Sequence, residues 1–142
     1  MVHDRPFAAV DPATLYRILQ LRSQAFVVEQ ECVFLEPDGR DLEATCRLLW
    51  VLDESGVEVV ATARVIDDGP ARRIGRIVTA EPARRQGLAA SLVTHFLDTT
   101  AGPWVLDAQS HLAPWYAAFG FEVSGDEYLD DGIPHVPMRR PS

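Results

Sequence analysis

Residues 80–93 read Ala80-Glu-Pro-Ala-Arg-Arg-Gln-Gly-Leu-Ala-Ala-Ser-Leu-Val93, and this stretch decides the fold. Two arginines and one glycine lead into an apolar segment with helical spacing, and the strand-like run 74–79 comes directly before it. The start of a helix carries free backbone N–H groups and the positive end of the helix dipole, so it attracts phosphate groups. The sequence therefore predicts an anion site where a strand passes into a helix.

The spacing of this stretch, Arg84-x-x-Gly87-x-Ala89, excludes two common phosphate-binding motifs. No Gly-Lys-Ser/Thr follows, as a Walker loop requires, and the Gly-x-Gly-x-x-Gly of a dinucleotide fold is absent. Gly87 allows the backbone to approach a ligand closely because it has no side chain. From these residues alone, an ordinary amphipathic helix after a glycine-containing loop remains the alternative.

Length and composition indicate one globular domain over residues 1–142, long enough to bury one substantial core. The formal net charge of −8 argues against nucleic acid as a partner, since such binding needs a basic surface, and is compatible with a cationic substrate. The two cysteines, Cys32 and Cys46, have no metal-ligand spacing, so we expect reduced thiols and no metal. No signal-like or membrane-length apolar run is present, so we expect a cytoplasmic protein without membrane contact.

The hydrophobic pattern predicts an alternation of strands and helices without repeats or long linkers. Asp11 and Pro12 are typical of a helix start, and Gly120 is typical of a helix end. The expected elements are a strand at 7–10, a helix from 11 to about 28, strands at 47–53, 57–66 and 72–79, a helix at 87–100, a strand at 104–108, a helix at 112–119 and strands at 121–123 and 134–138. This order predicts an α/β protein of the α+β type, with antiparallel hairpins first and a β-α-β crossover in the second half.

Residues 115–121, Trp-Tyr-Ala-Ala-Phe-Gly-Phe, form the second informative motif. With the motif at 84–89, they resemble the GNAT acetyltransferases, which carry Tyr-x-x-x-Gly-Phe after the fifth strand. The resemblance implies the GNAT acyl-CoA N-acyltransferase fold, a central mixed β-sheet flanked by helices, with acetyl-CoA as co-substrate. It also implies that Tyr116 donates a proton to the departing thiolate, a role worth about 10²–10⁴ in rate. Taken alone, a tyrosine on a short helix is more often a core residue.

The same resemblance implies a set of cofactor-binding residues. The helix start and its two arginines would hold the pyrophosphate, and the fourth strand would supply backbone groups to the pantetheine arm and the acetyl carbonyl. A glutamine stands where many family members have an asparagine near the cofactor. The residues expected in these roles are Ile77, Val78, Thr79, Arg84, Arg85, Gln86, Gly87, Leu88, Ala89 and Gln109.

A general base is harder to assign from the sequence. Several GNAT enzymes carry Glu or His on the fourth strand, and residues 74–79 contain neither. Glu29 and His111 are therefore the candidates that join Tyr116 as catalytic residues, with His135 as a further candidate and water as an alternative route for the proton.

Three further motifs resemble the ElaA-like branch of the superfamily: Arg22-x-x-x-Phe26-Val-Val-Glu-Gln30, Asp38-Gly-x-Asp41 and Asp131-Gly-Ile-Pro-His135. One departure is Leu48, where relatives commonly have a histidine. A polar loop with five carboxylates would either cap the cleft and recognise a cationic acceptor or form a solvated acidic loop. Those carboxylates are Glu29, Glu31, Glu36, Asp38 and Asp41.

The leading hypothesis is direct acetyl transfer from acetyl-CoA to a primary amine, on a small molecule or on a peptide or protein. The alternatives are a non-catalytic acyl-CoA-binding sensor or interaction module, and a phosphate-binding domain unrelated to CoA. The resemblance allows a homodimer, which the sequence itself does not specify. One fold can carry many different sites, so a fold does not specify a substrate. The motifs therefore indicate the acetyl donor and leave the amine acceptor open.

Overall fold

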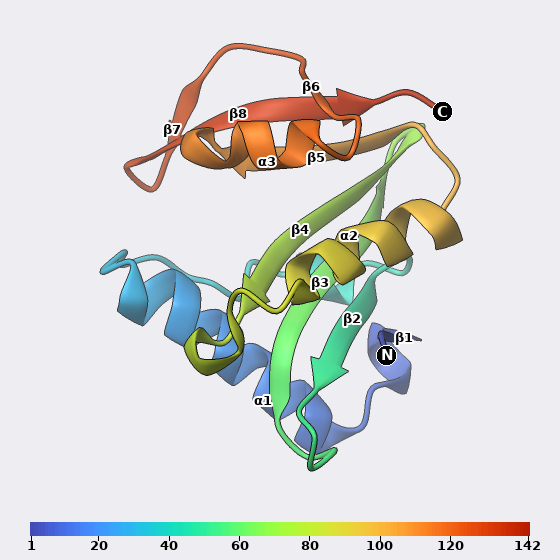
Figure 1. Ribbon diagram of the computed structural model, residues 1–142, viewed down its shortest axis with the longest axis vertical. Helices are drawn as coiled ribbons and strands as arrows, with labels where there is room; N and C mark the ends of the chain where they lie inside the picture. Colours follow the sequence, from blue (N-terminus) through green and yellow to red (C-terminus); the bar gives the residue numbers. More distant parts are fainter.

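A mixed eight-stranded sheet forms the centre of the computed structural model, which describes residues 1–142 (Figure 1). The strands follow the order β1-β2-β3-β4-β5-β8-β6, and β7 pairs with β8. Their bounds are β1 His3–Pro6, β2 Arg47–Leu52, β3 Val59–Asp68, β4 Ala71–Thr79, β5 Trp104–Gln109, β6 Glu122–Val123, β7 Tyr128–Asp130 and β8 Ile133–Arg140. This arrangement confirms the mixed α/β class expected from the order of the elements.

Three α-helices flank the sheet, α1 Pro12–Ser23, α2 Leu88–Thr99 and α3 Ala113–Ala117. The Asp11 carboxylate accepts the Thr14 N–H at 3.0 Å and caps α1, as its sequence predicted. A π-helical turn, η2 Gln24–Glu29, continues α1 and brings the predicted helix close to its expected length. None of these helices combines the length and apolar character needed to cross a membrane.

The sheet separates two apolar cores, and β2 alternates between them. Leu48 packs in the core that contains Ile18 of α1, whereas Leu49 packs in the core that contains Phe96 of α2. All four side chains are fully buried. The period-two alternation of a strand with both faces covered thus holds α1 and α2 on opposite sides of the sheet.

The feature that positions the site is a split between β4 and β5. These parallel strands pair only at their first residues, Arg72 with Trp104 and Arg73 with Val105. Beyond that point β4 stays paired with β3 and β5 with β8, so the two halves of the sheet diverge (Figure 1). Backbone groups on the facing edges therefore have no strand partner over most of their length.

A β-bulge lies in β4 beside this split. Thr62 pairs with Val78 and Arg64 pairs with Gly75, so two residues of β4 face one residue of β3. Arg76, inside the bulge, has a φ of +52°, which is unusual for a residue other than glycine. Bulges leave a residue unpaired and redirect side chains, and here the redirection occurs at the open edge.

Two predictions about the strands were wrong. Residues 7–10 do not form the first strand: β1 is His3–Pro6, and a 3₁₀ turn, η1 Phe7–Ala9, follows it. Pairing with β2 ends at Pro6, and one further hydrogen bond runs from the Phe7 N–H to the Cys46 carbonyl at 3.1 Å before the chain turns away. The strand β7 was not among the expected elements, and residues 131 and 132 form the turn after it. Both turn residues have positive φ, 49° and 80°, which suits a tight hairpin joining β7 to β8.

Candidate active site

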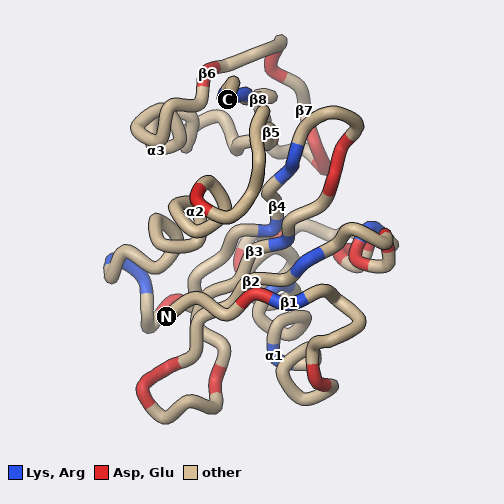
Figure 2. Tube along the Cα trace, turned by 90° about the vertical axis from the view of Figure 1, so that its right-hand side faces the viewer, with Lys and Arg blue, Asp and Glu red and all other residues tan.

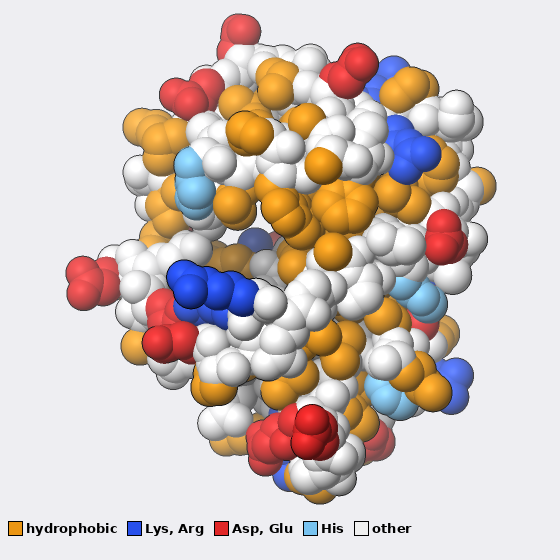
Figure 3. All heavy atoms as spheres, in the orientation of Figure 1, with side chains coloured by type: hydrophobic (Ala, Val, Ile, Leu, Met, Phe, Trp, Pro, Cys, Tyr) orange, Lys and Arg blue, Asp and Glu red, His pale blue; other side chains and the backbone are white.

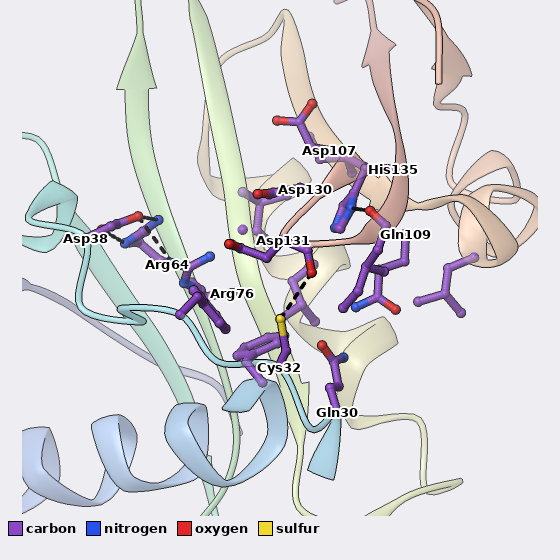
Figure 4. Close-up of a pocket in the computed structure, with 18 of the residues that line it drawn as sticks. Gln30, Cys32, Asp38, Arg64, Arg76, Asp107, Gln109, Asp130, Asp131 and His135 are labelled. Atoms are coloured by element: carbon purple, nitrogen blue, oxygen red, sulfur yellow. Dashed lines mark hydrogen bonds and ion pairs between the residues drawn. The ribbon is translucent and has the colours of Figure 1, made fainter. Parts of the chain in front are cut away.

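The split opens into a cleft of about 430 Å³ between the two halves of the sheet. In the space-filling view the molecule is hollowed there, with apolar side chains along the rim (Figure 3). One wall comes from β3, β4 and the loop after η2, and the other comes from β5, α3 and the β7–β8 hairpin (Figure 4). Residues that line it include Phe26, Cys32, Asp38, Arg64, Arg76, Ile77, Gln109, Tyr116, Asp130, Asp131 and His135.

Tyr116 lies on α3 and contributes to the cleft wall, with 8% of its surface exposed. Its ring packs edge-on against Trp115 at 4.9 Å and Phe121 at 6.5 Å, which fixes its orientation. The hydroxyl makes no hydrogen bond within the chain, and burial raises the pKa of Tyr116 to about 12. It is therefore a protonated, uncommitted donor in a cleft that is otherwise rich in ion pairs.

The start of α2 has the features of an anion site. Gly87, with a φ of +76°, precedes the helix, and no side chain caps it. The first hydrogen bond of the helix runs from Ser91 N–H to the Gly87 carbonyl. None of the backbone N–H groups from Arg85 to Ala90, which include those of Gln86, Leu88 and Ala89, has a partner within the chain. These free donors and the helix dipole point the same way and suit a phosphate.

The two arginines before α2 differ in what they contact. Arg84 is already engaged: its Nη2 donates to Glu29 at 2.6 Å and its Nε to the Thr79 carbonyl at 3.0 Å. Arg85 is exposed and makes no ion pair or hydrogen bond through its side chain. Figure 3 shows a basic patch over this loop. Of the two, Arg85 is the arginine available to an anion.

The three candidate bases lie in different surroundings. Glu29 forms the ion pair with Arg84 and does not line the cleft. His111 is exposed in the 3₁₀ turn η5 Ser110–Leu112, also outside the cleft lining. His135 lines the cleft, and its Nδ1 lies 2.7 Å from the Ile133 carbonyl oxygen. A carbonyl can only accept, so Nδ1 is the donor in this contact, and in the neutral tautomer that donates from Nδ1 the lone pair is on Nε2.

Comparison with known proteins agrees with this geometry. Residues 36–141 match the family model described as an acetyltransferase (GNAT) domain. The chain belongs to the GNAT acetyltransferase family. A UPF0039 protein of Mycobacterium tuberculosis is 44% identical over 137 residues, covering 93% of this chain and 87% of the relative. The fold is thus the GNAT acyl-CoA N-acyltransferase fold that the motifs implied.

Solved structures support the assignment to the ElaA-like branch. An acyl-CoA N-acyltransferase from Pseudomonas aeruginosa superposes with a TM-score of 0.92 at 34% identity, covering 99% of this chain and 98% of that one. Escherichia coli ElaA superposes with a TM-score of 0.90 at 33% identity, with the same coverage. The predicted membership in the ElaA-like branch of the GNAT family is confirmed.

The cofactor-binding residues expected on β4 and β5 differ in whether they line the cleft. Ile77 and Gln109 line the cleft from opposite walls. Val78 is buried in the core on the α1 side, so only its backbone is available at the open edge. Thr79 is half-buried at the end of β4. Leu48 lies in the α1 core and does not line the cleft, so the departure from relatives there lies away from this site.

The ElaA-like motifs build a buried ion cluster that sequence reasoning missed. Arg22, 1% exposed, donates to both Glu36 and Asp41, which are 2% and 6% exposed. Its Nη1 and Nη2 lie 2.7 and 3.0 Å from the Asp41 oxygens, and Nη2 lies 3.0 Å from Glu36. Burial opposes the charged forms, but these contacts raise the pKa of Arg22 and lower that of Asp41. The sequence signal for the cluster was limited to Arg22 and Asp41, which belong to these motifs, whereas Glu36 lies outside them.

The cluster corrects both interpretations of the acidic loop for two of its five carboxylates. Glu36 and Asp41 are neither solvated nor free for a cationic acceptor, because Arg22 satisfies them. Asp38 binds Arg64 at 2.8 and 2.9 Å. Although burial alone would raise it, these bonds lower the pKa of Asp38 to about 2. The loop does reach the cleft through Asp38. There Asp38 is paired with Arg64 of β3 and Arg76 of β4, so it is not a free acid.

No group of three or more His, Cys, Asp or Glu side chains in the chain is arranged to hold a metal ion. The two cysteines differ in position. Cys32 lines the cleft and its thiol donates to the Asp131 carbonyl at 3.4 Å, whereas Cys46 is buried in the α1 core, where burial raises its pKa to about 11.

Proposed function

We propose that this GNAT acyltransferase moves an acetyl group from acetyl-CoA directly to a primary amine, on a small molecule or on a peptide or protein. One observation carries the proposal: the open edge of β4 joins an uncapped helix start at one end to a free tyrosine hydroxyl in the cleft wall. An extended thioester with a pyrophosphate at its far end matches that order of groups.

The donor would bind in three parts. The pyrophosphate would take the free N–H groups from Arg85 to Ala90, with the Arg85 guanidinium beside it. The pantetheine arm would run along the unpaired edge of β4. The thioester carbonyl would accept from a backbone N–H at the bulge, near Ile77. A rigid backbone donor there would stabilise the oxyanion that develops during attack.

The reaction needs two proton transfers. The substrate ammonium gives up one proton to a base and thence to solvent, and the neutral amine attacks the carbonyl carbon. A C–N bond forms and the C–S bond breaks. Tyr116 donates its proton to the departing sulfur and regains one from the nitrogen. The high pKa and free hydroxyl of Tyr116 support this role.

His135 has the best position for the base. Its Nε2 makes no hydrogen bond within the chain, and Figure 4 shows the ring among the residues that line the cleft. Glu29 and His111 remain candidates from the sequence, but unlike His135 neither of them lines the cleft. Water could carry the proton from the amine to His135.

The test mixes the protein, acetyl-CoA and a panel of primary amines and follows thiol release together with the mass of the acetylated products. The chain contains no lysine, so self-acetylation would be confined to the N-terminus and adds little background. Turnover with an acetylated amine as product supports the proposal. Calorimetric binding of acetyl-CoA without turnover on any amine or peptide would support the non-catalytic module instead, and absence of binding would overturn both.

A further inference from the structure

The arginines of the cleft differ in how fully their donors are used. Four of them line it, and three have a carboxylate oxygen within 2.8 Å. These pairs are Arg40 with Glu43, Arg64 with Asp38 and Arg73 with Asp68. Arg76 has none that close: its nearest carboxylate oxygens are at 3.3 Å on Asp38 and 3.4 Å on Glu36.

Arg76 also leaves most of its donors unused. Its Nη2 donates to the Glu36 carbonyl at 3.0 Å and to Asp38 Oδ2 at 3.3 Å, but its Nε is buried without a hydrogen-bond partner, and its Nη1 makes no hydrogen bond within the chain. A buried polar group without a partner costs free energy, and such a group in a native protein needs an explanation. Both neighbouring carboxylates are shared, because Arg22 also binds Glu36 and Arg64 also binds Asp38.

The surroundings of Arg76 hold it in the cleft wall. Its guanidinium lies 5.9 Å from the Phe26 ring centroid and 5.7 Å from that of Phe34. Its backbone is in the left-handed region, inside the bulge where the acetyl carbonyl would bind. Strained backbone of this kind persists where the surrounding structure over-determines it, often at ligand sites. Of its free donors, Nε is buried, so Nη1 is the one that a ligand in the cleft can reach.

The opposite wall carries the opposite charge. Asp130 and Asp131, at the end of β7 and in the turn after it, line the cleft, and neither carboxylate takes part in a hydrogen bond or ion pair. Figure 4 shows both on the side of the cleft that faces Arg76, and Figure 2 shows acidic positions near β7 facing basic ones on β3 and β4. A ligand that spans the cleft would meet a cationic group on one side and anionic groups on the other.

We propose that the acceptor is an amino acid zwitterion whose carboxylate binds Arg76 while its amine lies toward Asp130, Asp131 and His135. The N–H groups of Arg76 Nη1 are free, and a guanidinium donor suits a carboxylate. The ammonium group would approach the two acids and then lose its proton to His135. This inference rests on the proposed function and narrows its acceptor to a class.

The test compares each natural α-amino acid with its decarboxylated amine and its amide, with acetyl-CoA as donor and thiol release as the readout. We expect kcat/KM to be about 10- to 100-fold higher for the preferred amino acid than for either analogue, the factor typical of a hydrogen bond to a charged group. The amide is the sharper control. It keeps the side chain, and its less basic amine is more often deprotonated, so a slower reaction of the amide would reflect the missing carboxylate. Amino sulfonates of the same length distinguish a carboxylate site from a general anion site.

Three variants make the role of Arg76 specific. R76M and R76K should raise KM for the amino acid about 10- to 100-fold and abolish the preference over the decarboxylated amine. R76K keeps the positive charge but lacks the planar guanidinium. It therefore tests the same role if R76M fails to fold. The control is R5M, a matched change of an exposed arginine on β1 outside the cleft. Calorimetry should show unchanged acetyl-CoA affinity in all three.

The outcomes separate the two proposals. If acetyl-CoA binds and amines are acetylated, but amino acids react no better than their amines or amides, the amino acid assignment is wrong and the acetyltransferase proposal stands. Preference for amino sulfonates, or an R76K enzyme with wild-type selectivity, would also overturn it. If acetyl-CoA binds and no compound is acetylated, the proposed function itself fails.

Discussion

Replacing Arg22 with methionine should destabilise the fold strongly, because this arginine neutralises two buried carboxylates at once. Its side chain is 1% exposed and contacts Glu36 and Asp41 through all three guanidinium nitrogens. Methionine has a similar length and no charge, so the change removes the partner and largely keeps the volume. Asp41 would keep Arg64 at 3.4 Å, and Glu36 would keep Arg76 at 3.4 Å.

The magnitude follows from burial. Removing one partner of a buried ion pair costs about 3–5 kcal/mol, since a charge is left in the interior without compensation. A domain of this size typically loses roughly 2–4 °C in Tm per kcal/mol, so Arg22→Met should lower Tm by about 6–20 °C. The matched control is Arg17→Met on the same helix, where the side chain is 34% exposed and lies 3.8 Å from Glu58. Exposed pairs contribute about 0–1 kcal/mol, so the control should stay near wild type.

Urea unfolding followed by tryptophan fluorescence measures both variants, at pH 7 and at pH 4.5. In the wild type the folded pKa of Asp41 lies below its unfolded value. Its stabilising contribution is therefore present above the unfolded pKa and lost as pH falls through the folded one. In Arg22→Met the unpaired carboxylates should have raised folded pKa values, so their cost is largest at neutral pH and fades on acidification. The gap between wild type and variant should narrow at pH 4.5.

A loss below about 1 kcal/mol, or a gap that stays constant with pH, would refute the reasoning. The triple variant Arg22→Met, Glu36→Gln, Asp41→Asn gives a second check. Removing the carboxylate charges should recover part of the lost free energy of unfolding. If the triple variant is less stable than Arg22→Met at pH 7, uncompensated charge is not the cause of the loss.

Four predictions concern the reaction itself. Tyr116→Phe should lower kcat by about 10²-fold or more with little change in Tm, since the hydroxyl has no partner to lose; an unchanged kcat contradicts its role. His135→Gln should lower kcat by a similar factor and leave acetyl-CoA affinity intact by calorimetry. Arg85→Met should weaken acetyl-CoA binding by roughly threefold to tenfold, and less at high salt, because it is exposed. Cys32→Ala should keep full turnover, whereas ping-pong kinetics lost in this variant would indicate an acyl-enzyme on that thiol.

Local chemistry made much of the fold predictable. Asp11 and Pro12 mark the start of α1 because capping depends on neighbours in sequence. Gly87 marks the start of α2 for the same reason. The first strand was misplaced because the apolar run after Pro6 suits a strand, while the pairing that decides the matter comes from β2, some forty residues away.

The residues of the candidate site also fall into those that the sequence could predict and those that it could not. The helix start and Tyr116 belong to short motifs, so their approximate positions could be inferred. The role of Arg76 could not, because a strand pattern does not reveal a bulge, and the bulge decides where that side chain points. Arg22 lies on a helix that was predicted, but its partners lie in a loop whose path depends on tertiary contacts.

The split sheet implies that ligand and fold are thermodynamically linked. Only two residue pairs join β4 to β5, so the two halves are coupled by little backbone hydrogen bonding. A thioester lying in the gap would supply bonds to β4 that no strand supplies, and it would bind the folded state alone. By mass action, a ligand concentration of a hundred times Kd then raises the free energy of unfolding by about 2.7 kcal/mol. That increase is enough to raise the melting temperature measurably. The concentration of that thioester would then affect how long the folded protein survives, as well as how fast it works.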